Sequence, residues 1–155
     1  MQVDEARVTA LVDLHGVAVA PPASIHTVAC DVLAPCALGG TLNATTIPEL
    51  RCAAVCGSAN NQLLEEADGD RLAAAGVLYV PDYVVNAGGI INIAEEWGGY
   101  DPARAAARIA AIGPTTAEVL RLAEAEGTTP VVAADRVAER RIAAARAHRH
   151  DGRSR

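Results

Sequence analysis

The chain has 155 residues, 51% of them hydrophobic, and a formal net charge of −6; this length fits one domain that buries about two-thirds of its surface on folding. No apolar run reaches the roughly 18 residues that cross a bilayer, and the first residues lack the basic and apolar segments of a signal peptide, so we expect a cytoplasmic protein that does not bind membranes. The negative charge argues against nucleic acid as a partner, because binding to phosphates needs a clustered basic face.

The first predicted element is a helix over residues 4–15. Val8, Leu11 and Val12 recur at helical spacing and would share one face. Gly16 follows at the position where glycine commonly ends a helix in the left-handed conformation.

Three uninterrupted apolar runs follow, at residues 32–34, 53–56 and 77–80. Helical segments are predicted between them, a brief one at residues 46–51 and a longer one at residues 62–75 that loosens around its Asp-Gly-Asp sequence. Buried runs that alternate with helices favour a parallel sheet covered on both faces, which makes the predicted fold class α/β.

From about residue 88 the predicted structure is helical only. Asp101 and Pro102 are typical of a helix start, and Gly113-Pro114 should kink or break the helix that they begin. The next helix ends at Gly127, again a residue that favours helix termination.

The last predicted helix begins at Thr129-Pro130 and reaches about Ala147, and residues 148–155 are expected to form a disordered tail. The apolar side chains expected to face inward are Val132, Val137 and Ile142. Basic residues alternate with Asp135 and Glu139, which is typical of a solvated helix face. They are Arg136, Arg140, Arg141, Arg146 and Arg149.

The cysteines and histidines lack the spacing of a metal site, so we expect no metal. Cys52 and Cys56 bracket an apolar run, which indicates small buried thiols in a reducing compartment.

Glycines and amides follow each predicted strand, at Gly39-Gly40, Asn60-Asn61 and Asn86. In an open parallel sheet, ligands bind at the carboxyl edge, where these residues would meet. Carboxamides offer donors and acceptors without charge, which suits a carboxamide, a hydroxyl or an amino acid as the ligand. Two structural alternatives remain open: Asn61 caps the following helix, or the glycine pair forms an ordinary tight turn.

Candidates for acid–base chemistry are few. No carboxylate pairs with a nucleophile or a histidine at informative spacing, and Ser58 does not lie in a G-x-S-x-G sequence. The available carboxylates are Asp31, Glu65, Glu66 and Asp82. From the residues alone, the sequence predicts the ligand-binding half of an α/β fold.

Four segments in this order resemble the C-terminal NAD-binding domain of the leucine/valine/phenylalanine dehydrogenases, in the glutamate dehydrogenase superfamily. They are APCALGG at residues 34–40, GSANNQL at 57–63, VPDYVVNAGG at 80–89 and AADRVAERR at 133–141. The likeness runs from about residue 3 to about residue 147 and is closest to valine and leucine dehydrogenase.

The resemblance implies oxidative deamination of an L-amino acid to a 2-oxo acid and ammonia, with NAD as the hydride acceptor. By resemblance, Asn86 would hold the nicotinamide carboxamide, and Asn60 would contact both coenzyme and substrate. The other residues that would line the coenzyme are Ala37, Leu38, Ser58 and Ala59.

The resemblance also places Ile90 and Ile93 in the pocket for the substrate side chain. Two β-branched residues narrow such a pocket, which favours leucine, valine or isoleucine over phenylalanine. A methylene is worth only about 1–3 kcal/mol of discrimination, so the expectation is a preference.

The sequence departs from the family in two respects. Full-length members carry an N-terminal substrate domain with catalytic lysines, whereas these 155 residues include no lysine, so we assign no catalytic residue. No G-x-G-x-x-G is present either. We therefore expect residues 1–147 to form an incomplete Rossmann-type doubly wound parallel sheet followed by C-terminal helices.

These departures predict a C-terminal fragment of an amino-acid dehydrogenase that is inactive alone. The alternative is a non-catalytic module that binds a nucleotide or an amino acid, or a subunit completed by a separate N-terminal chain. In either case apolar surface should remain exposed and promote self-association unless the missing domain covers it.

Overall fold

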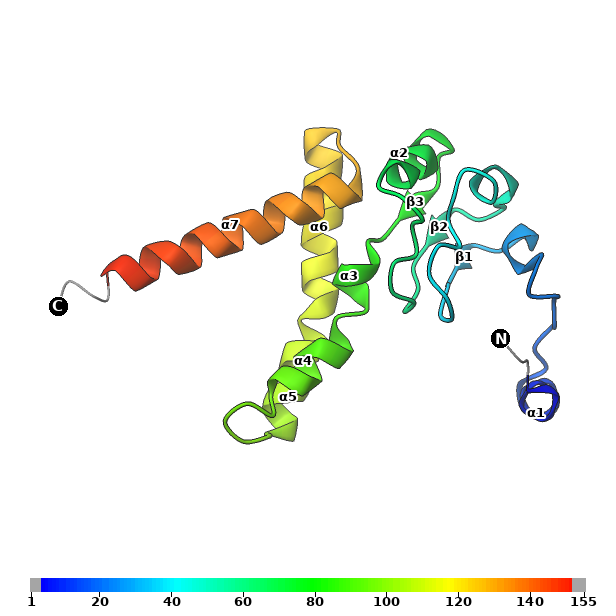
Figure 1. Ribbon diagram of the computed structural model, residues 1–155, viewed down its shortest axis with the longest axis horizontal. Helices are drawn as coiled ribbons and strands as arrows, with labels where there is room; N and C mark the ends of the chain where they lie inside the picture. The colour runs from blue at the N-terminus through cyan, green and yellow to red at the C-terminus, as the bar shows by residue number, and fades with distance from the viewer. Residues whose placement is uncertain (1–3, 152–155) are drawn as a thin grey trace.

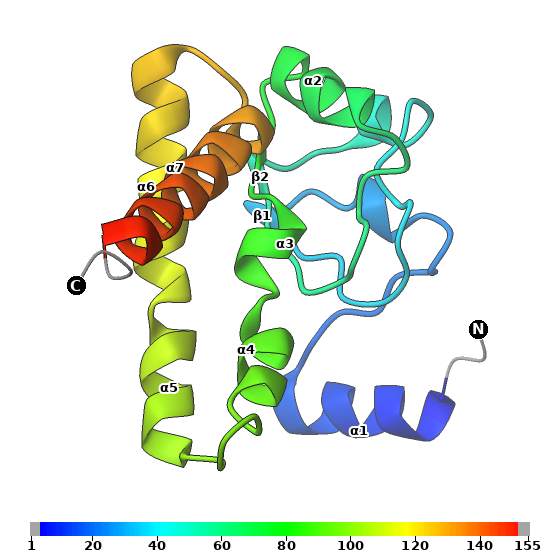
Figure 2. The same cartoon turned by 60° about the vertical axis from the view of Figure 1, so that its left-hand side comes forward.

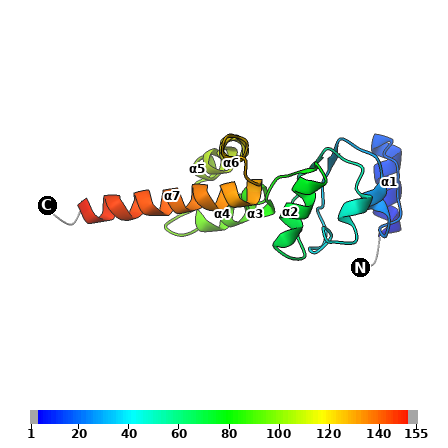
Figure 3. The same ribbon diagram turned by 90° about the horizontal axis from the view of Figure 1, so that it is seen from above.

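The computed structural model describes the backbone of residues 4–151 and the side chains of residues 4–147. A small sheet lies between an isolated N-terminal helix and a group of C-terminal helices (Figure 1). Seen from above, α1 and the end of α7 lie at opposite ends of an elongated molecule (Figure 3).

The sheet has three parallel strands in chain order, which confirms the α/β fold class. Its register aligns Leu33, Val55 and Tyr79 in one row that faces the core, whereas Val32 and Leu78 of the other row are exposed. This sheet is therefore open on one face within the described residues, rather than covered on both. The strands are β1 (Val32–Leu33), β2 (Ala54–Val55) and β3 (Leu78–Tyr79).

The first core lies between the sheet, the 3₁₀ helix η2 (Ile47–Glu49) and α2 (Ala67–Ala74). The expected helix over residues 62–75 begins only at Ala67, because Leu63 instead forms a parallel bridge with Leu42. The expected irregularity at the Asp-Gly-Asp sequence is also absent, because α2 runs through residues 68–70. The buried members of this core are Leu42, Ile47, Val55, Leu72, Val77 and Tyr79.

The second half of the described chain is helical, as predicted. Figure 2 shows α3 and α4 alongside the α5–α6 pair. The predicted break falls at Ala111, two residues before Gly113, because Pro114 has no N–H to donate back to Ala110. These helices are α3 (Asp82–Val85), α4 (Gly88–Ala94), α5 (Pro102–Ala110), α6 (Ile112–Glu126) and α7 (Pro130–Asp151).

A second core forms where α6 packs on α7. Val137 is buried there as expected, but Val132 and Ile142 are exposed because no described element covers their side of α7. The helix extends to Asp151, so residues 148–151 continue it; the rest of the expected tail lies outside the described residues. The buried members of this core are Val119, Ala123, Ala133, Ala134 and Val137.

The arginines of α7 lie on a solvated face, as predicted. Arg136 and Arg140 pair with Glu126 of α6, and Arg141 pairs with Glu118. Arg146 is exposed, and the side chain of Arg149 lies outside those described.

The N-terminal helix α1 (Glu5–His15) forms as predicted, with Asp4 as its N-cap and a left-handed Gly16 after it. The helix buries no residue, and Leu11 is 51% exposed, so its expected apolar face has no described partner. The short η1 (Ile25–Thr27) links it to the sheet. Large apolar side chains are thus left exposed, as expected from the sequence, and Trp97 is 95% exposed.

All four cysteines are free. Cys52 and Cys56 are half-buried, whereas Cys30 and Cys36 are exposed, so the expected burial is only partial. No cluster that could hold a metal occurs among the described side chains. None of the helices within residues 4–151 is long and apolar enough to cross a membrane.

Glu95 joins α4 to α5 through ion pairs with Arg108 and Arg104, and its side chain is 2% exposed. Arg108, and then Arg104, lower the pKa of Glu95. Because the folded chain favours the carboxylate, the stabilisation is complete above the unfolded pKa of roughly 4.3 and is lost as pH falls through the lower folded value.

We therefore expect the melting temperature of the wild type to fall more steeply between about pH 5 and pH 3 than that of Glu95→Gln. Thermal melts followed by circular dichroism measure this. Glu96→Gln is the matched control, because Glu96 is exposed and forms no ion pair among the described side chains. Parallel curves for the wild type and Glu95→Gln would contradict the role of these ion pairs.

Candidate functional site

The candidate site lies at the carboxyl edge of the sheet, where the segments after all three strands meet. In open parallel sheets this edge is where ligands bind. The segment after β1 carries Gly39-Gly40, the segment after β2 carries Asn60-Asn61, and α3 after β3 leads to Asn86.

Two glycines allow the first two segments to touch. A Cβ on Gly39 would lie 2.7 Å from the carbonyl oxygens of both Asn60 and Asn61, and a Cβ on Gly57 would lie 2.2 Å from the carbonyl oxygen of Pro35. Such distances leave no room for a side chain, so close approach, and not merely a tight turn, requires glycine at both positions.

Asn60 and Asn86 come together at this edge. The Nδ2 of Asn86 donates to the Oδ1 of Asn60 over 2.7 Å. The side chain of Asn60 is exposed and that of Asn86 is half-buried, so the pair is accessible. Once this bond is formed, Asn60 keeps two N–H donors, and Asn86 keeps one donor and its carbonyl oxygen. The pair can therefore hold a ligand that carries both a donor and an acceptor.

Asn61 is not a helix cap. Its backbone is left-handed with φ 52°, the one positive φ outside glycine among the described residues. Its N–H donates to Oδ2 of Asp82 over 2.7 Å, and its carbonyl accepts from Gly40 over 2.7 Å. The turn that carries the amides is thus held by both neighbouring segments.

Asp82 and Tyr79 form the buried support of this turn. The Tyr79 hydroxyl donates to Oδ1 of Asp82 over 2.9 Å. Burial, and secondly this hydrogen bond, raises the pKa of Tyr79, so the hydroxyl remains a donor. The sequence indicated Asp82 only as an unpaired carboxylate; its spacing of three from a tyrosine was the signal available.

The other residues expected at the coenzyme lie around the same edge. Ala37, Leu38 and Ser58 are exposed in the segments after β1 and β2. Hydrogen bonds from the hydroxyl and then the N–H of Ser58 lower the pKa of the neighbouring Cys36 thiol. Ala59 differs: its side chain is 4% exposed, its N–H donates to Pro35, and its carbonyl accepts from Gln62. Ala59 therefore packs inside the turn.

Ile90 and Ile93, expected in a substrate pocket, lie on α4 at i and i+3 and so share a face. They are 66% and 62% exposed. Ile90 and Ile93 thus form an exposed apolar surface on α4, and the described residues do not close it into a pocket.

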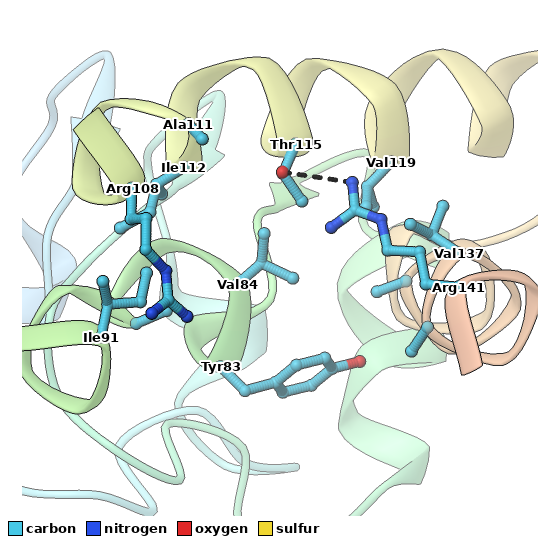
Figure 4. A pocket seen from close by; sticks show the side chains of 13 residues that line it. Tyr83, Val84, Ile91, Arg108, Ala111, Ile112, Thr115, Val119, Val137 and Arg141 are labelled. Carbon is cyan, nitrogen blue, oxygen red and sulfur yellow. Dashed lines mark hydrogen bonds between the residues drawn. The ribbon is translucent and has the colours of Figure 1, made fainter. Parts of the chain in front are cut away.

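A cavity of about 410 Å³ lies between the helices (Figure 4). Neither Asn60 nor Asn86 lines it, although Ala87, the residue after Asn86, does. Its wall is mainly apolar, with Arg108 at one end and Arg141, bonded to Thr115, at the other. The sequence does not predict this cavity, because its wall draws on every helix from α3 to α7 and these share no motif. The labelled lining residues are Tyr83, Val84, Ile91, Arg108, Ala111, Ile112, Thr115, Val119, Val137 and Arg141.

Comparisons with known proteins agree on one family. A family model described as glutamate/leucine/phenylalanine/valine dehydrogenase matches residues 1–150. Leucine dehydrogenase of Bacillus cereus is 48% identical over 132 residues, which cover 85% of this chain and 36% of that protein. Valine dehydrogenase of Streptomyces albus is 51% identical over 119 residues, covering 77% of this chain and 33% of that protein.

A solved structure is also similar. L-tryptophan dehydrogenase from Nostoc punctiforme superposes with a TM-score of 0.89 and 41% sequence identity, over 93% of this chain and 43% of that one. The chain thus spans about a third of the length of the curated relatives that it matches.

Proposed function

The chain belongs to the glutamate/leucine/phenylalanine/valine dehydrogenase family, and we propose that it forms the coenzyme-binding part of an NAD-dependent branched-chain amino-acid dehydrogenase. The reaction converts an L-amino acid, NAD⁺ and water to a 2-oxo acid, ammonium, NADH and a proton. The observation that carries the proposal is the Asn60–Asn86 pair at the carboxyl edge of the sheet.

The donors and acceptors left on this pair match a carboxamide, the group that the nicotinamide ring carries. When bound, NAD supplies the hydride acceptor. The role of Asn86 and Asn60 is to fix the orientation of the ring, because hydride transfer requires the reacting carbons to be held a few ångströms apart. Ala37, Leu38 and Ser58 would contact the rest of the coenzyme from the neighbouring segments.

Proton transfer needs groups from outside these 155 residues. Both carboxylate oxygens of Asp82 already accept hydrogen bonds within the fold, and the sequence contains no lysine. We therefore propose that the chain alone does not turn over. The exposed apolar surface would then be covered by the substrate-binding part or by a second copy. The four free cysteines favour a reducing compartment, in keeping with the cytoplasm.

The proposed substrate is leucine or valine, because Ile90 and Ile93 present two β-branched side chains beyond Asn86. One similar protein is a tryptophan dehydrogenase, so family membership alone does not select the substrate. The size of the apolar wall is the feature that favours a branched aliphatic side chain.

A chimera tests both the coenzyme role and the substrate preference. We would replace the corresponding segment of the Bacillus cereus leucine dehydrogenase with the 132 matched residues of this chain. We expect NADH formation with leucine and valine, and a kcat/KM at least about tenfold lower with phenylalanine and tryptophan. The 155-residue chain, assayed alone, is the control and should form no NADH.

A folded chimera without activity would count against the coenzyme role and favour a non-catalytic binding module. Activity of the 155-residue chain alone would refute the proposal that proton transfer needs additional residues. Equal rates with aliphatic and aromatic substrates would refute the proposed role of the two isoleucines.

A further inference from the structure

Two adjacent residues of one loop are each tied to the same short helix. Asn61 donates its N–H to Asp82, the first residue of α3, and Asn60 accepts from Asn86, which follows the last. The Asn86 N–H donates to the Asp82 carbonyl over 2.8 Å, so one helical turn separates the two attachment points. A single link would leave the loop free to pivot, whereas two links fix its orientation on α3.

Asp82 is buried, and hydrogen bonds alone hold its carboxylate. The residue is only 8% exposed. Among the described side chains, no Lys, Arg or His forms an ion pair with its carboxylate. A buried carboxylate without a cation is unfavourable unless hydrogen bonds compensate for the lost water. Here Tyr79 and Asn61 provide them, one on each oxygen.

The backbone of Asn61 is left-handed, with φ 52°. Residues other than glycine are uncommon in this conformation; asparagine adopts it more readily than most, and hydrogen bonds from the surroundings stabilise it there. The buried Gln62 closes the turn from the inner side through the carbonyls of Gly57 and Ala59, over 2.8 and 3.0 Å. Asp82 is the partner on the side of α3, through its bond with the Asn61 N–H.

We propose that Asp82 is a positioning residue, which holds Asn61 in its left-handed conformation and thereby keeps the Asn60 side chain within hydrogen-bonding distance of Asn86. The inference deepens the proposed function, since a ring carboxamide can be gripped only if the two amides keep their spacing. Asp82 itself does not touch the ligand.

Nitrogen-15 NMR of the full 155-residue chain tests this role without a ligand. In Asp82→Ala we expect hydrogen exchange at the Asn61 amide to rise about 10- to 100-fold, as expected for loss of a hydrogen bond to a charged group. We also expect the nuclear Overhauser contacts between the Asn60 and Asn86 side-chain amides to disappear. Retention of those contacts with unchanged exchange would overturn the proposal.

Asp68→Ala is the matched control. Asp68 is also buried, and it accepts the Glu65 N–H over 3.0 Å while pairing with Arg71. It lies in α2, and its hydrogen bonds do not involve Asn60, Asn61 or Asn86. We expect Asp68→Ala to lower the melting temperature and to leave the Asn60–Asn86 contacts intact. Loss of the contacts in this control as well would show general loosening and overturn the specific role.

If Asp82→Ala does not fold, Asp82→Asn replaces it. The amide oxygen can still accept from Asn61, while its NH₂ faces the Tyr79 oxygen, so the Asn60–Asn86 contacts should survive with a smaller rise in Asn61 exchange. Exchange at the wild-type rate in this variant would contradict the proposal.

Titration of the chimera with NADH separates this inference from the proposed function, because the 155 residues alone lack the glycine-rich turn G-x-G-x-x-G. A folded chimera that does not bind NADH, together with loss of the Asn60–Asn86 contacts in the Asp82→Ala chain, would support positioning and refute the coenzyme role. Measurable NADH binding with equal affinity in the chimera and in its Asp82→Ala variant would support the coenzyme role and refute positioning.

Discussion

Replacement of Gly57 by alanine is expected to reduce the free energy of unfolding by about 3 kcal/mol or more. The added Cβ would lie 2.2 Å from the carbonyl oxygen of Pro35 and 2.5 Å from its nitrogen. Both are backbone atoms in the segment after β1, so relief requires the exits of β1 and β2 to separate. Urea unfolding followed by circular dichroism measures the change.

Gly113→Ala is the matched control for the same chemical change. Gly113 lies in α6, and no atom outside its own helical turn comes within 4 Å of the place that a methyl group would take. Alanine in a helix is favoured over glycine by about 0.5–1 kcal/mol, but Pro114 follows directly, and its ring opposes a Cβ on the preceding residue. Gly113→Ala should therefore stay within about 1 kcal/mol of the wild type. A Gly57→Ala chain as stable as the wild type would contradict the contact between the two segments.

The location of the candidate site could be predicted from the sequence, because ligands in open parallel sheets bind at the carboxyl ends of the strands. Apolar runs predicted where the three strands lie, and parallel strands present their carboxyl ends at one edge. Asn60 and Asn86 were therefore expected together although they are 26 positions apart, and their hydrogen bond places them so. Local features could also be predicted from the sequence, such as the helix N-cap at Asp101 and the left-handed C-cap at Gly127.

Features that depend on tertiary contacts could not be predicted from the sequence. Helix α2 starts late because Leu63 pairs with Leu42, a contact between segments that local propensity does not encode. The contacts of Asp82 could not be predicted from the sequence, because its partners are a backbone N–H and a phenol instead of a nucleophile or a histidine at a recognisable spacing. The exposure of one row of the sheet and of α1 could not be predicted either, because it depends on which other segments pack against them.

In the active chimera, Asn86→Ala is expected to lower kcat/KM for leucine by about 10- to 100-fold. The variant removes both the bond to Asn60 and the proposed bond to the nicotinamide carboxamide, and lost hydrogen bonds of roughly 1.5–3 kcal/mol correspond to this range. Asn86→Asp should be worse, because a carboxylate would face the Asn60 oxygen across the 2.7 Å contact with no N–H to donate. Initial rates at varied NAD concentrations measure both variants.

Asn92→Ala is the control for loss of a carboxamide in the same region. Asn92 lies in α4, and its oxygen accepts from the Tyr100 hydroxyl over 2.8 Å instead of facing Asn60. Its kcat/KM should stay within about threefold of the parent chimera, since a surface contact contributes less than about 1 kcal/mol. Asn60→Ala combined with Asn86→Ala should be less harmful than the product of the single effects, because both remove the same hydrogen bond. A wild-type rate in Asn86→Ala would contradict the proposed role, because the nicotinamide ring would then be held by other residues. The Asn60–Asn86 hydrogen bond would in that case be only a structural contact at the edge of the sheet.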